Sequence, residues 1–458
     1  MPRDFHIKNA TAYYKGQWQK INLTIKNGKI ENISSDNSLT KYPKDNIPTY
    51  NAEGLHLFPG FIDIHVHFRE PGQEEKETIA TGTRAAARGG YTTVCTMPNL
   101  DPVPDSLPHL AIQQEKIKKD ARVHVFPYAS ITIGQKGEKI SDLQALAPEV
   151  FAFSDDGFGV QNEKLMKEAM LKAKSLGKCI VAHAEEKNLV KNGVIHDGKY
   201  AHTHGHNGNP SISEWKQVER DLKLAEQTGV TYHVCHVSTK ESIELIRDAK
   251  RRGVNVTCET APHYLVLNDE LLQEEGRFRM NPPIRSKKDQ LALLQAVKDG
   301  TILCIATDHA PHTAEEKSKG LDHSLNGIVG LETAFPILYT KLVETHQLSL
   351  EALIDLFSTR PKRRFSFANI TQSRNGLPVS NGIEIGEVAD LTLFDLSEEY
   401  CINPDEFLSK GKASPFSGEI VRGRCKLTIV GADVAYYENT ITRWSNPEYD
   451  TLFSKDSK

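Results

Sequence analysis

Two histidines one residue apart, His65 and His67, stand at the end of a short apolar run. Alternate residues of a β-strand point to the same side, so both imidazole rings can reach one metal ion. Such a pair also arises by chance or as a purely structural feature. It gains weight here because further imidazoles and carboxylates follow later apolar runs of the chain: Asp155, Asp156, His183, His236 and Asp308.

Four imidazoles and two carboxylates exceed the three protein ligands that a single catalytic zinc ion takes. They suit a two-metal centre whose ions lie about 3.5–4 Å apart and share a bridging hydroxide. One carboxylate is ambiguous, because Asp155 and Asp156 are adjacent and would point in opposite directions on a strand. The residues alone predict a binuclear hydrolytic centre and leave both aspartates open as the bridge.

Eight short apolar runs would place these residues, at 61–64, 92–96, 123–128, 150–153, 179–182, 232–236, 254–258 and 302–306. Stretches with helical periodicity separate most of them, at 77–88, 162–176, 214–228 and 240–252. Alternation of this kind predicts an α/β fold of the (β/α)8 TIM barrel type, whose functional residues lie at the C-terminal ends of the strands. A doubly wound open sheet competes, but no glycine-rich phosphate fingerprint follows the first strand.

Both ends of the chain have a β-rich texture instead. Residues 8–14 and 21–25 alternate between apolar and polar side chains, and Asn27-Gly28 after the second run is typical of a tight hairpin turn. Residues 389–394 and 425–430 repeat the pattern. We therefore expect a small β-sandwich domain built jointly from residues 1–57 and 371–458, beside a barrel of residues 58–370.

The composition excludes several classes of protein. The chain has 458 residues and a formal net charge of −4, so it lacks the basic excess that nucleic-acid binding needs. Its mean hydropathy is −0.45, and no apolar run approaches the roughly 18–20 residues that span a bilayer, so no membrane association is expected. The N-terminus lacks a secretory signal, and the seven cysteines are scattered. We expect buried, reduced thiols and a cytoplasmic location.

Two longer motifs resemble the signatures of a known family. The segment GFIDIHVHFREPG at residues 60–72 is similar to the opening signature of the amidohydrolase superfamily, and of its dihydroorotases in particular. TDHAPH at residues 307–312 resembles their second signature, and FSDDG at residues 153–157 is similar to the bacterial class I type, in which an aspartate bridges the metals. The resemblance extends over most of the chain.

This resemblance implies two zinc ions per subunit. The implied ligands are His65, His67 and Asp308 for one ion, His183 and His236 for the other, and Asp156 as the bridge. Asp155 is the rival for the bridge, and the spacing between Asp156 and His183 agrees with the family pattern. Asp308 is also the implied catalytic residue, which accepts a proton from the attacking water and passes it to the leaving amide nitrogen.

The implied substrate contacts are Arg69, Asn99, Asn281, His312 and Gly327. Arg69 offers a planar guanidinium that suits the carboxylate of dihydroorotate, and Asn99 and His312 would complete that grip. A surface salt bridge to Glu70 or Glu74 is the alternative explanation for Arg69.

Two of these contacts are less direct. Asn281 would bond the ring amides, although an asparagine before Pro282-Pro283 also suits a turn. Gly327 would offer backbone contacts to the ring, but Asn326 replaces the apolar residue that many relatives have before this glycine. The polar stretch 313–325 that precedes it is expected to be a long, mobile lid.

The implied activity is the reversible hydrolysis of (S)-dihydroorotate to N-carbamoyl-L-aspartate in pyrimidine biosynthesis, by an enzyme that forms a homodimer. Two alternatives remain. A dihydropyrimidinase, hydantoinase or allantoinase would usually bridge its metals with a carboxylated lysine, and the fourth run ends in aspartates instead. A catalytically inactive dihydroorotase-like subunit that scaffolds a partner would typically lose metal ligands, and all six positions are kept here.

Other features are interpreted as structural. The three histidines within 202–206 lie in a loop rich in glycine and asparagine, where we expect a solvated segment without carboxylate partners. His233 should face away from His236, and His263 is assigned no role. The basic clusters 250–252 and 362–364 should be solvated, and the acids within 74–77 should begin a helix.

Overall fold

Parallel strands from the middle of the chain form the centre of the molecule. The computed structural model describes residues 4–35, 47–365, 367, 378–380, 382–431, 433–438 and 443–445. Within these, three strands pair in the order β6-β7-β8 and four in the order β14-β13-β12-β9. Their bounds are β6 (Phe61–Val66), β7 (Tyr91–Thr96), β8 (His124–Pro127), β9 (Cys179–Ala182), β12 (Thr231–Val234), β13 (Val256–Thr260) and β14 (Cys304–Ile305).

Isolated parallel bridges join the two groups into a ring. Phe153 bridges Ala129 on one side and Ile180 on the other, and Val66 bridges His309 beyond the end of β14. The fourth expected strand, 150–153, is therefore reduced to a single bridging residue instead of a regular strand. With that difference, the predicted (β/α)8 barrel is confirmed.

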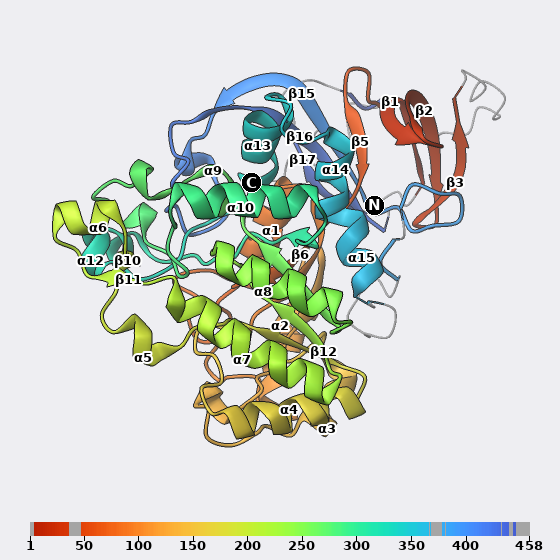
Figure 1. Cartoon of the computed structure of the whole chain (residues 1–458). Coiled ribbons are helices and arrows are strands. Elements are labelled where there is room, and N and C mark those ends of the chain that lie inside the picture. The colour runs from red at the N-terminus through yellow and green to blue at the C-terminus, as the bar shows by residue number, and fades with distance from the viewer. Residues whose placement is uncertain are drawn as a thin grey trace.

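Helices surround the ring (Figure 1). The main ones are α1 (Ile79–Arg88), α2 (Leu107–Asp120), α4 (Glu163–Ser175), α7 (Ile212–Thr228), α8 (Lys240–Arg251), α10 (Lys287–Lys298), α13 (Ala334–Leu338), α14 (Leu350–Ile354) and α15 (Arg360–Arg364). Polar side chains satisfy their first free N–H groups: Asn162 accepts from Lys164 and Leu165, and Thr239 accepts from Ser242. The periodic stretches seen in the sequence thus become helices with local start signals.

The first of these helices begins later than expected. Thr78 caps α1 through a capping box with Thr81, so the helix starts at Ile79. Glu77 therefore lies outside the helix, fully buried, and accepts a hydrogen bond from the Ser409 hydroxyl. The expectation that the acids within 74–77 begin a helix is wrong, because all of them precede the cap at Thr78, and the Glu77 carboxylate bonds a distant segment of the chain.

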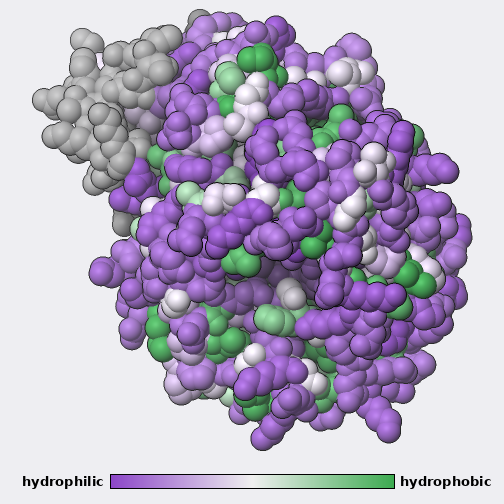
Figure 2. All heavy atoms as spheres, turned by 90° about the vertical axis from the view of Figure 1, so that its left-hand side faces the viewer, coloured by the Kyte–Doolittle hydropathy of each residue, from purple (hydrophilic) through white to green (hydrophobic). Residues whose placement is uncertain are grey.

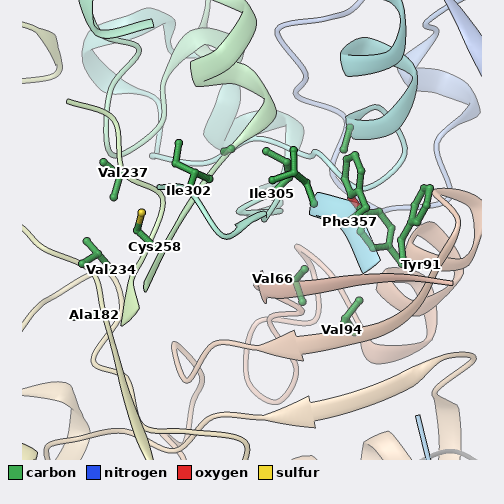
Figure 3. Packing of buried hydrophobic residues seen from close by; sticks show 14 of the residues in the cluster. Val66, Tyr91, Val94, Ala182, Val234, Val237, Cys258, Ile302, Ile305 and Phe357 are labelled. Carbon is green, nitrogen blue, oxygen red and sulfur yellow. The ribbon is translucent and has the colours of Figure 1, made fainter. Parts of the chain in front are cut away.

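Strands buried on both faces explain the near-continuous apolar runs. In β9, Cys179 and Val181 belong to the cluster inside the barrel, whereas Ile180 and Ala182 pack towards the helices. Figure 3 shows side chains of the helix-facing cluster, which is supplied by both strand groups. The expected buried thiols are confirmed: all seven cysteines are free, and all but Cys401 are buried.

Strands from both chain ends form a second, eight-stranded sheet in the order β17-β16-β15-β5-β1-β2-β3, with β4 beside β1. Figure 1 shows it beside the barrel. Its strands are β1 (Phe5–Tyr14), β2 (Gln17–Lys26), β3 (Lys29–Ser34), β4 (Thr49–Asn51), β5 (His56–Pro59), β15 (Leu391–Cys401), β16 (Ile420–Val430) and β17 (Asp433–Tyr437). One hydrophobic cluster draws on both ends of the chain. The expected hairpin also forms, with Asn27 at φ 49° and Gly28 at φ 81° between β2 and β3.

The sheet and the barrel meet at β5. This strand pairs with β15 as far as Pro59, so the sheet continues beyond the expected boundary at 57/58. Gly60 follows at once, where a Cβ would lie 2.1 Å from the Thr92 hydroxyl oxygen, so only glycine fits between β5 and the barrel. The other expected boundary, at 370/371, lies outside the described residues.

Smaller elements cluster beyond the C-terminal ends of the barrel strands. They are α5 (Lys187–Val190), β10 (Ile195–His196), α6 (Lys199–His204), β11 (Gly208–Asn209), α9 (Pro262–Val266), α11 (Ala314–Lys317) and α12 (Gly320–His323). Ile195, Phe278 and Leu321 contribute to one apolar cluster that joins three of these loops. No helix in the described ranges has the length and apolar character needed to cross a membrane.

An aromatic cluster holds the barrel and the terminal sheet together. The ring of Phe394 in β15 lies 5.4 Å from Phe61 in β6 and 4.4 Å from Phe335 in α13, measured between centroids.

We predict that Phe394→Ala lowers the free energy of unfolding by about 3–5 kcal/mol, because it leaves a cavity between the two parts. Urea denaturation checks this. Phe158→Ala, at a ring that is 45% exposed, is the control and should be nearly neutral. A neutral Phe394→Ala would show that the joint does not depend on this ring.

Candidate metal centre and substrate site

The six expected metal ligands lie together at the C-terminal mouth of the barrel. They come from five strand positions of the ring, because His65 and His67 share the end of β6, and all are buried: His65, His67, Asp156, His183, His236 and Asp308. Figure 2 looks onto the side of the molecule that carries α6 and α12, which is mostly hydrophilic and hollowed near its middle. The convergence follows from barrel topology, because all strand ends of one polarity meet on one rim.

Asp156 lies at the centre of the group. Its Oδ1 is 3.4 Å from His65 Nε2, 3.7 Å from His183 Nδ1 and 3.5 Å from His236 Nε2. Its Oδ2 is 3.5 Å from His67 Nε2. One carboxylate therefore faces all four imidazoles, one oxygen towards three rings and the other towards the fourth.

Asp308 faces one half of the group. Its Oδ1 lies 3.1 Å from His67 Nε2 and 3.5 Å from His65 Nε2. In the other half, His183 Nδ1 lies 3.0 Å from His236 Nε2. The ligand atoms of His65, His67 and Asp308 all lie within 4.8 Å of one another, as do those of His65, Asp156 and His236.

These separations fit metal ions. Ligand atoms about 2.0–2.2 Å from a tetrahedral zinc lie roughly 3.3–3.6 Å from one another, close to the 3.0–3.7 Å found between the ligand atoms of this cluster. His65 Nε2 and Asp156 Oδ1 are buried and have no hydrogen-bond partner. Buried polar atoms without partners are costly, so their presence in the middle of the cluster supports an ion between them. The donor set of imidazoles and carboxylates suits zinc.

The backbone is unusual at three positions of the site. Arg69, His236 and Asp308 have φ values of 59°, 30° and 49°. Non-glycine residues rarely adopt positive φ, and such strain persists only where the surroundings enforce it. His236 follows β12 and Asp308 follows β14, so each departure from extended geometry changes the direction of a side chain just beyond a strand end.

Electrostatics keep the aspartates of the centre ionised. Burial raises the pKa of Asp156, but the positive charges of the neighbouring histidines, His65 first and then His67, bring it well below its ordinary value. Burial likewise raises the pKa of Asp308, and the hydrogen bond from His67 more than offsets it. Conversely, the pKa of His65 is raised, because the charges of Asp156 and Glu259 outweigh its burial. Carboxylates in this state are ready to hold cations.

The two adjacent aspartates have separate surroundings. Asp155 turns away from the histidines and accepts hydrogen bonds from the backbone N–H and the hydroxyl of Thr132. Burial raises the pKa of Asp155 to about 6. The geometry therefore supports Asp156 as the bridge. Asp155 instead stabilises the loop that contains Thr132.

Three carboxylates around the ligands had no role assigned from sequence; Glu259 and Asp63 are fully buried and Glu185 is partly exposed. Glu259 at the end of β13 accepts from His65 Nδ1 at 2.7 Å. Asp63 accepts from the backbone N–H groups of His65 and Thr307, and Glu185 lies 3.7 Å from His183 Nε2. Their positions near strand ends were the available signal. Asp63 and Glu185 lie two residues from the ligand that each contacts, whereas Glu259 and His65 are 194 positions apart.

Arg69 and His312 lie side by side at the edge of the centre. The Arg69 guanidinium donates through Nε to the Pro311 carbonyl at 3.3 Å, and its Nη2 lies 3.5 Å from His312 Nε2. Among the described residues no carboxylate forms an ion pair with Arg69, and Glu70 pairs with Lys116 instead. The alternative salt bridge from Arg69 to Glu70 or Glu74 is therefore wrong. A buried guanidinium without a direct ion-pair partner among the described residues is suited to an anionic ligand.

Two expected amide contacts also border the metal ligands. Asn99 Nδ2 donates to the backbone carbonyl of Asp156 at 2.6 Å, and Asn99 Oδ1 is buried without a partner. The Asn281 side chain bonds Glu185, and a cis peptide joins Asn281 to Pro282. Asn281 thus has both a turn conformation and a polar contact at the mouth.

Gly327 is held by close packing. Its φ is 140°, and a Cβ there would lie 2.4 Å from the Ala310 carbonyl oxygen. The preceding Asn326 is exposed; its side chain accepts from Arg279, and its carbonyl accepts from His312 Nε2 at 2.7 Å. The Asn326 side chain therefore contacts Arg279 and takes no part in the packing of Gly327 against Ala310.

The stretch 313–325 is more ordered than expected. It contains α11 and α12, and Thr313 begins α11 with a capping box. The buried Lys317 Nζ donates to the carbonyls of Arg279 and Leu325 at 2.9 and 2.7 Å. The stretch thus contains two short helices, and one buried lysine ties its C-terminal end to the segment at Arg279; its mobility as a lid stays a prediction.

The expectation of a loop without carboxylate partners at 202–206 is also wrong. His202 contacts Asp197, and His206 lies between Asp322 at 2.8 Å and Glu274 at 3.0 Å. His263 Nε2 is buried without a partner next to the centre, where burial lowers its pKa to about 4.

Comparisons with known proteins agree with this site. A family model described as dihydro-orotase-like matches residues 54–242. A dihydroorotase of Geobacillus sp. (strain WCH70) is 48% identical over 433 residues, which cover 94% of this chain and 98% of that protein. A dihydroorotase of Listeria monocytogenes serovar 1/2a is 47% identical and covers 93% of this chain and 97% of its own. The chain belongs to the dihydroorotase family.

Solved structures similar to this family member carry hydantoinase names. The L-hydantoinase (dihydropyrimidinase) from Arthrobacter aurescens superposes with a TM-score of 0.80 at 25% identity, covering 94% of this chain and 95% of that one. The D-hydantoinase from a Bacillus sp. AR9 has a TM-score of 0.80 at 22% identity, with 95% and 96% covered, and shows the shared fold alone.

The two aspartates give a direct test of the metal centre. We predict that Asp156→Ala loses paired metal binding, because it removes the carboxylate that faces all four imidazoles. Asp155→Ala should keep the metals and lose about 1–3 kcal/mol of stability, since Thr132 loses its acceptor. Metal content of the purified variants decides between them, and the reverse pattern would assign the bridge to Asp155.

Proposed function

We propose that this chain is a zinc-dependent dihydroorotase that reversibly hydrolyses (S)-dihydroorotate to N-carbamoyl-L-aspartate. The observation that carries the proposal is the placement of Arg69, a buried guanidinium without a carboxylate partner among the described residues, beside a six-ligand metal centre. The centre suits hydrolysis of an amide, and the guanidinium suits the carboxylate that distinguishes dihydroorotate from neutral cyclic amides.

The ligands divide into two sets around a shared carboxylate. His65, His67 and Asp308 would hold one zinc ion, His183 and His236 the other, and Asp156 would bridge them, as the distances around Asp156 support. When bound, zinc supplies Lewis acidity towards the scissile carbonyl and lowers the pKa of water towards neutrality.

Asp308 is the proposed proton carrier. Its pKa below the ordinary range keeps the carboxylate ionised and able to accept a proton from the attacking water. The same carboxyl then donates that proton to the amide nitrogen as the ring opens, so no amide anion has to leave. In ring closure the direction of both transfers is reversed.

Three side chains would fix the substrate. Arg69 takes the carboxylate through its planar fork, with Asn99 and His312 at its flanks. Burial and the neighbouring Arg69 lower the pKa of His312 to about 4, so its ring is neutral at pH 7 and acts through hydrogen bonds. Asn281 and the backbone at Gly327 lie where they can contact the ring amides.

The competing functions account for less of this geometry. A hydantoinase-type substrate has no carboxylate, which would leave the buried Arg69 without a direct ion-pair partner when substrate is bound. An inactive scaffold subunit does not require six converging ligands with unpartnered atoms. We further propose a homodimer, which the dihydroorotase resemblance implies, and a cytoplasmic location, which the buried free thiols support.

Asp308→Asn tests the proton carrier. The amide can still offer an oxygen to a metal but cannot accept the proton, so kcat should fall by about 10²–10⁴-fold while the fold is kept. Steady-state kinetics with a thermal melt as control measure this. Near-normal turnover would assign the proton transfer to another group.

The choice among cyclic amides tests the proposed substrate. Wild-type protein should hydrolyse dihydroorotate far faster than dihydrouracil or hydantoin, because only dihydroorotate gives Arg69 a charged partner. Loss of that contact costs roughly 2–5 kcal/mol, or about 30- to 5,000-fold in kcat/KM. Arg69→Met should remove most of the preference without fully rescuing the neutral rings. A wild-type preference for hydantoin or dihydrouracil would contradict the proposal.

A further inference from the structure

Glu259 contacts three histidines from inside the barrel. It is fully buried at the end of β13, and its Oε1 accepts from His65 Nδ1 at 2.7 Å and from the backbone N–H of His236 at 3.3 Å. Its Oε2 lies 3.2 Å from His233 Nε2. None of the metal-ligand or substrate-contact assignments above uses this carboxylate.

The contact with His65 selects one form of the imidazole ring. As a metal ligand the His65 imidazole is neutral and carries one proton, and donation from Nδ1 to Glu259 places that proton on Nδ1. His65 Nε2 is then a free acceptor, and it is the atom that faces Asp156 at 3.4 Å and Asp308 at 3.5 Å. Histidines that bind metals usually donate their second N–H to a carboxylate in this way.

The contact with His236 supports a strained backbone. His236 has a φ of 30°, which is unfavourable for a side chain with a Cβ. Its N–H points to Glu259 Oε1, and its ring reaches Asp156 Oδ1 at 3.5 Å. The acceptor therefore stabilises the backbone turn that directs this ring into the centre.

The far oxygen is fixed by a hydrogen-bonded chain. His233 lies next to Glu259 on the neighbouring strand, and its Nδ1 lies 2.8 Å from the Thr257 hydroxyl. Burial lowers the pKa of His233, so the ring is neutral, accepts from Thr257 and donates to Glu259. His233 thus fixes Oε2 of Glu259, while Oε1 accepts hydrogen bonds from His65 and from the backbone of His236.

We propose that Glu259 is a positioning residue that couples the two halves of the metal centre. Through one oxygen it sets the protonated nitrogen of His65, assigned to one ion, and the backbone of His236, assigned to the other. The inference rests on the proposed function, because it takes both histidines as zinc ligands. It predicts that a change at Glu259 weakens both ions together.

The test measures zinc binding rather than activity alone. Zinc affinity of the full chain is measured by competition with a chromogenic chelator, in the wild type and in Glu259→Gln. The amide can still accept at one atom but loses the charge, so we expect both zinc ions to bind about 10–100-fold more weakly. Saturating zinc should restore much of kcat, with KM for dihydroorotate near the wild-type value.

Asp221→Asn is the matched control. Asp221 is equally buried, accepts from Tyr232 and Arg220, and contacts none of the ligands. It should lower the melting temperature without changing zinc affinity. If Glu259→Gln does not fold, Glu259→Asp keeps the charge but shortens the reach, and it should show the same joint weakening.

The outcomes separate this inference from the proposed function. Wild-type zinc affinity in a folded Glu259→Gln or Glu259→Asp variant overturns the role of Glu259 and leaves the proposed function standing. Weakening of one ion with the other unchanged overturns the coupling. A wild-type chain that binds no zinc contradicts the proposed function, and with it this role.

Discussion

The structure of this site depends on the burial of one carboxylate, Asp156, among four imidazoles. Removing a charge from water costs several kcal/mol unless opposite charge and hydrogen bonds compensate. Here the compensation comes from four rings at the ends of three strands, β6, β9 and β12, at 3.4–3.7 Å. These distances are too long for good hydrogen bonds and suit ligands that share an ion. The barrel is the scaffold that brings such distant residues to one point, because its strand ends form a closed rim.

Much of the barrel could be predicted, because parallel strands buried on both faces leave continuous apolar runs in the sequence. The candidate ligands were also visible, since each follows such a run. Their directions were not, because the positive φ values of His236 and Asp308 break the alternation of strand side chains. The 150–153 run shows the same limit, since its apolar pattern does not reveal that it pairs through Phe153 alone.

Long-range polar contacts were the least predictable part. Glu259 and His65 are 194 positions apart, and nothing local in either segment indicates that they bond. Lys317 looks like a surface lysine in a polar stretch, yet it is buried and holds two carbonyls. Burial lowers the pKa of Lys317 to about 7, so this lysine does not carry the full positive charge that a formal count of the sequence assigns to it. Contacts of this kind follow from tertiary packing and leave no periodic signal.

The metal centre and the substrate grip are built on different supports. The metal ligands lie at strand ends above the barrel core, whereas His312 and Gly327 lie on a segment held by Lys317, by Arg279 and by the C-terminal chain. Val329 donates to the Ala413 carbonyl at 2.9 Å, and a Cβ at Gly411 would lie 2.6 Å from Pro311 Cβ, so that chain packs tightly against the segment. Loop contacts can change while the core stays the same, which is consistent with hydantoinase-named structures that share this fold at 22–25% identity. We therefore propose that substrate choice in this chain is decided at the rim, where one buried guanidinium without a carboxylate ion-pair partner among the described residues would favour an anionic ring.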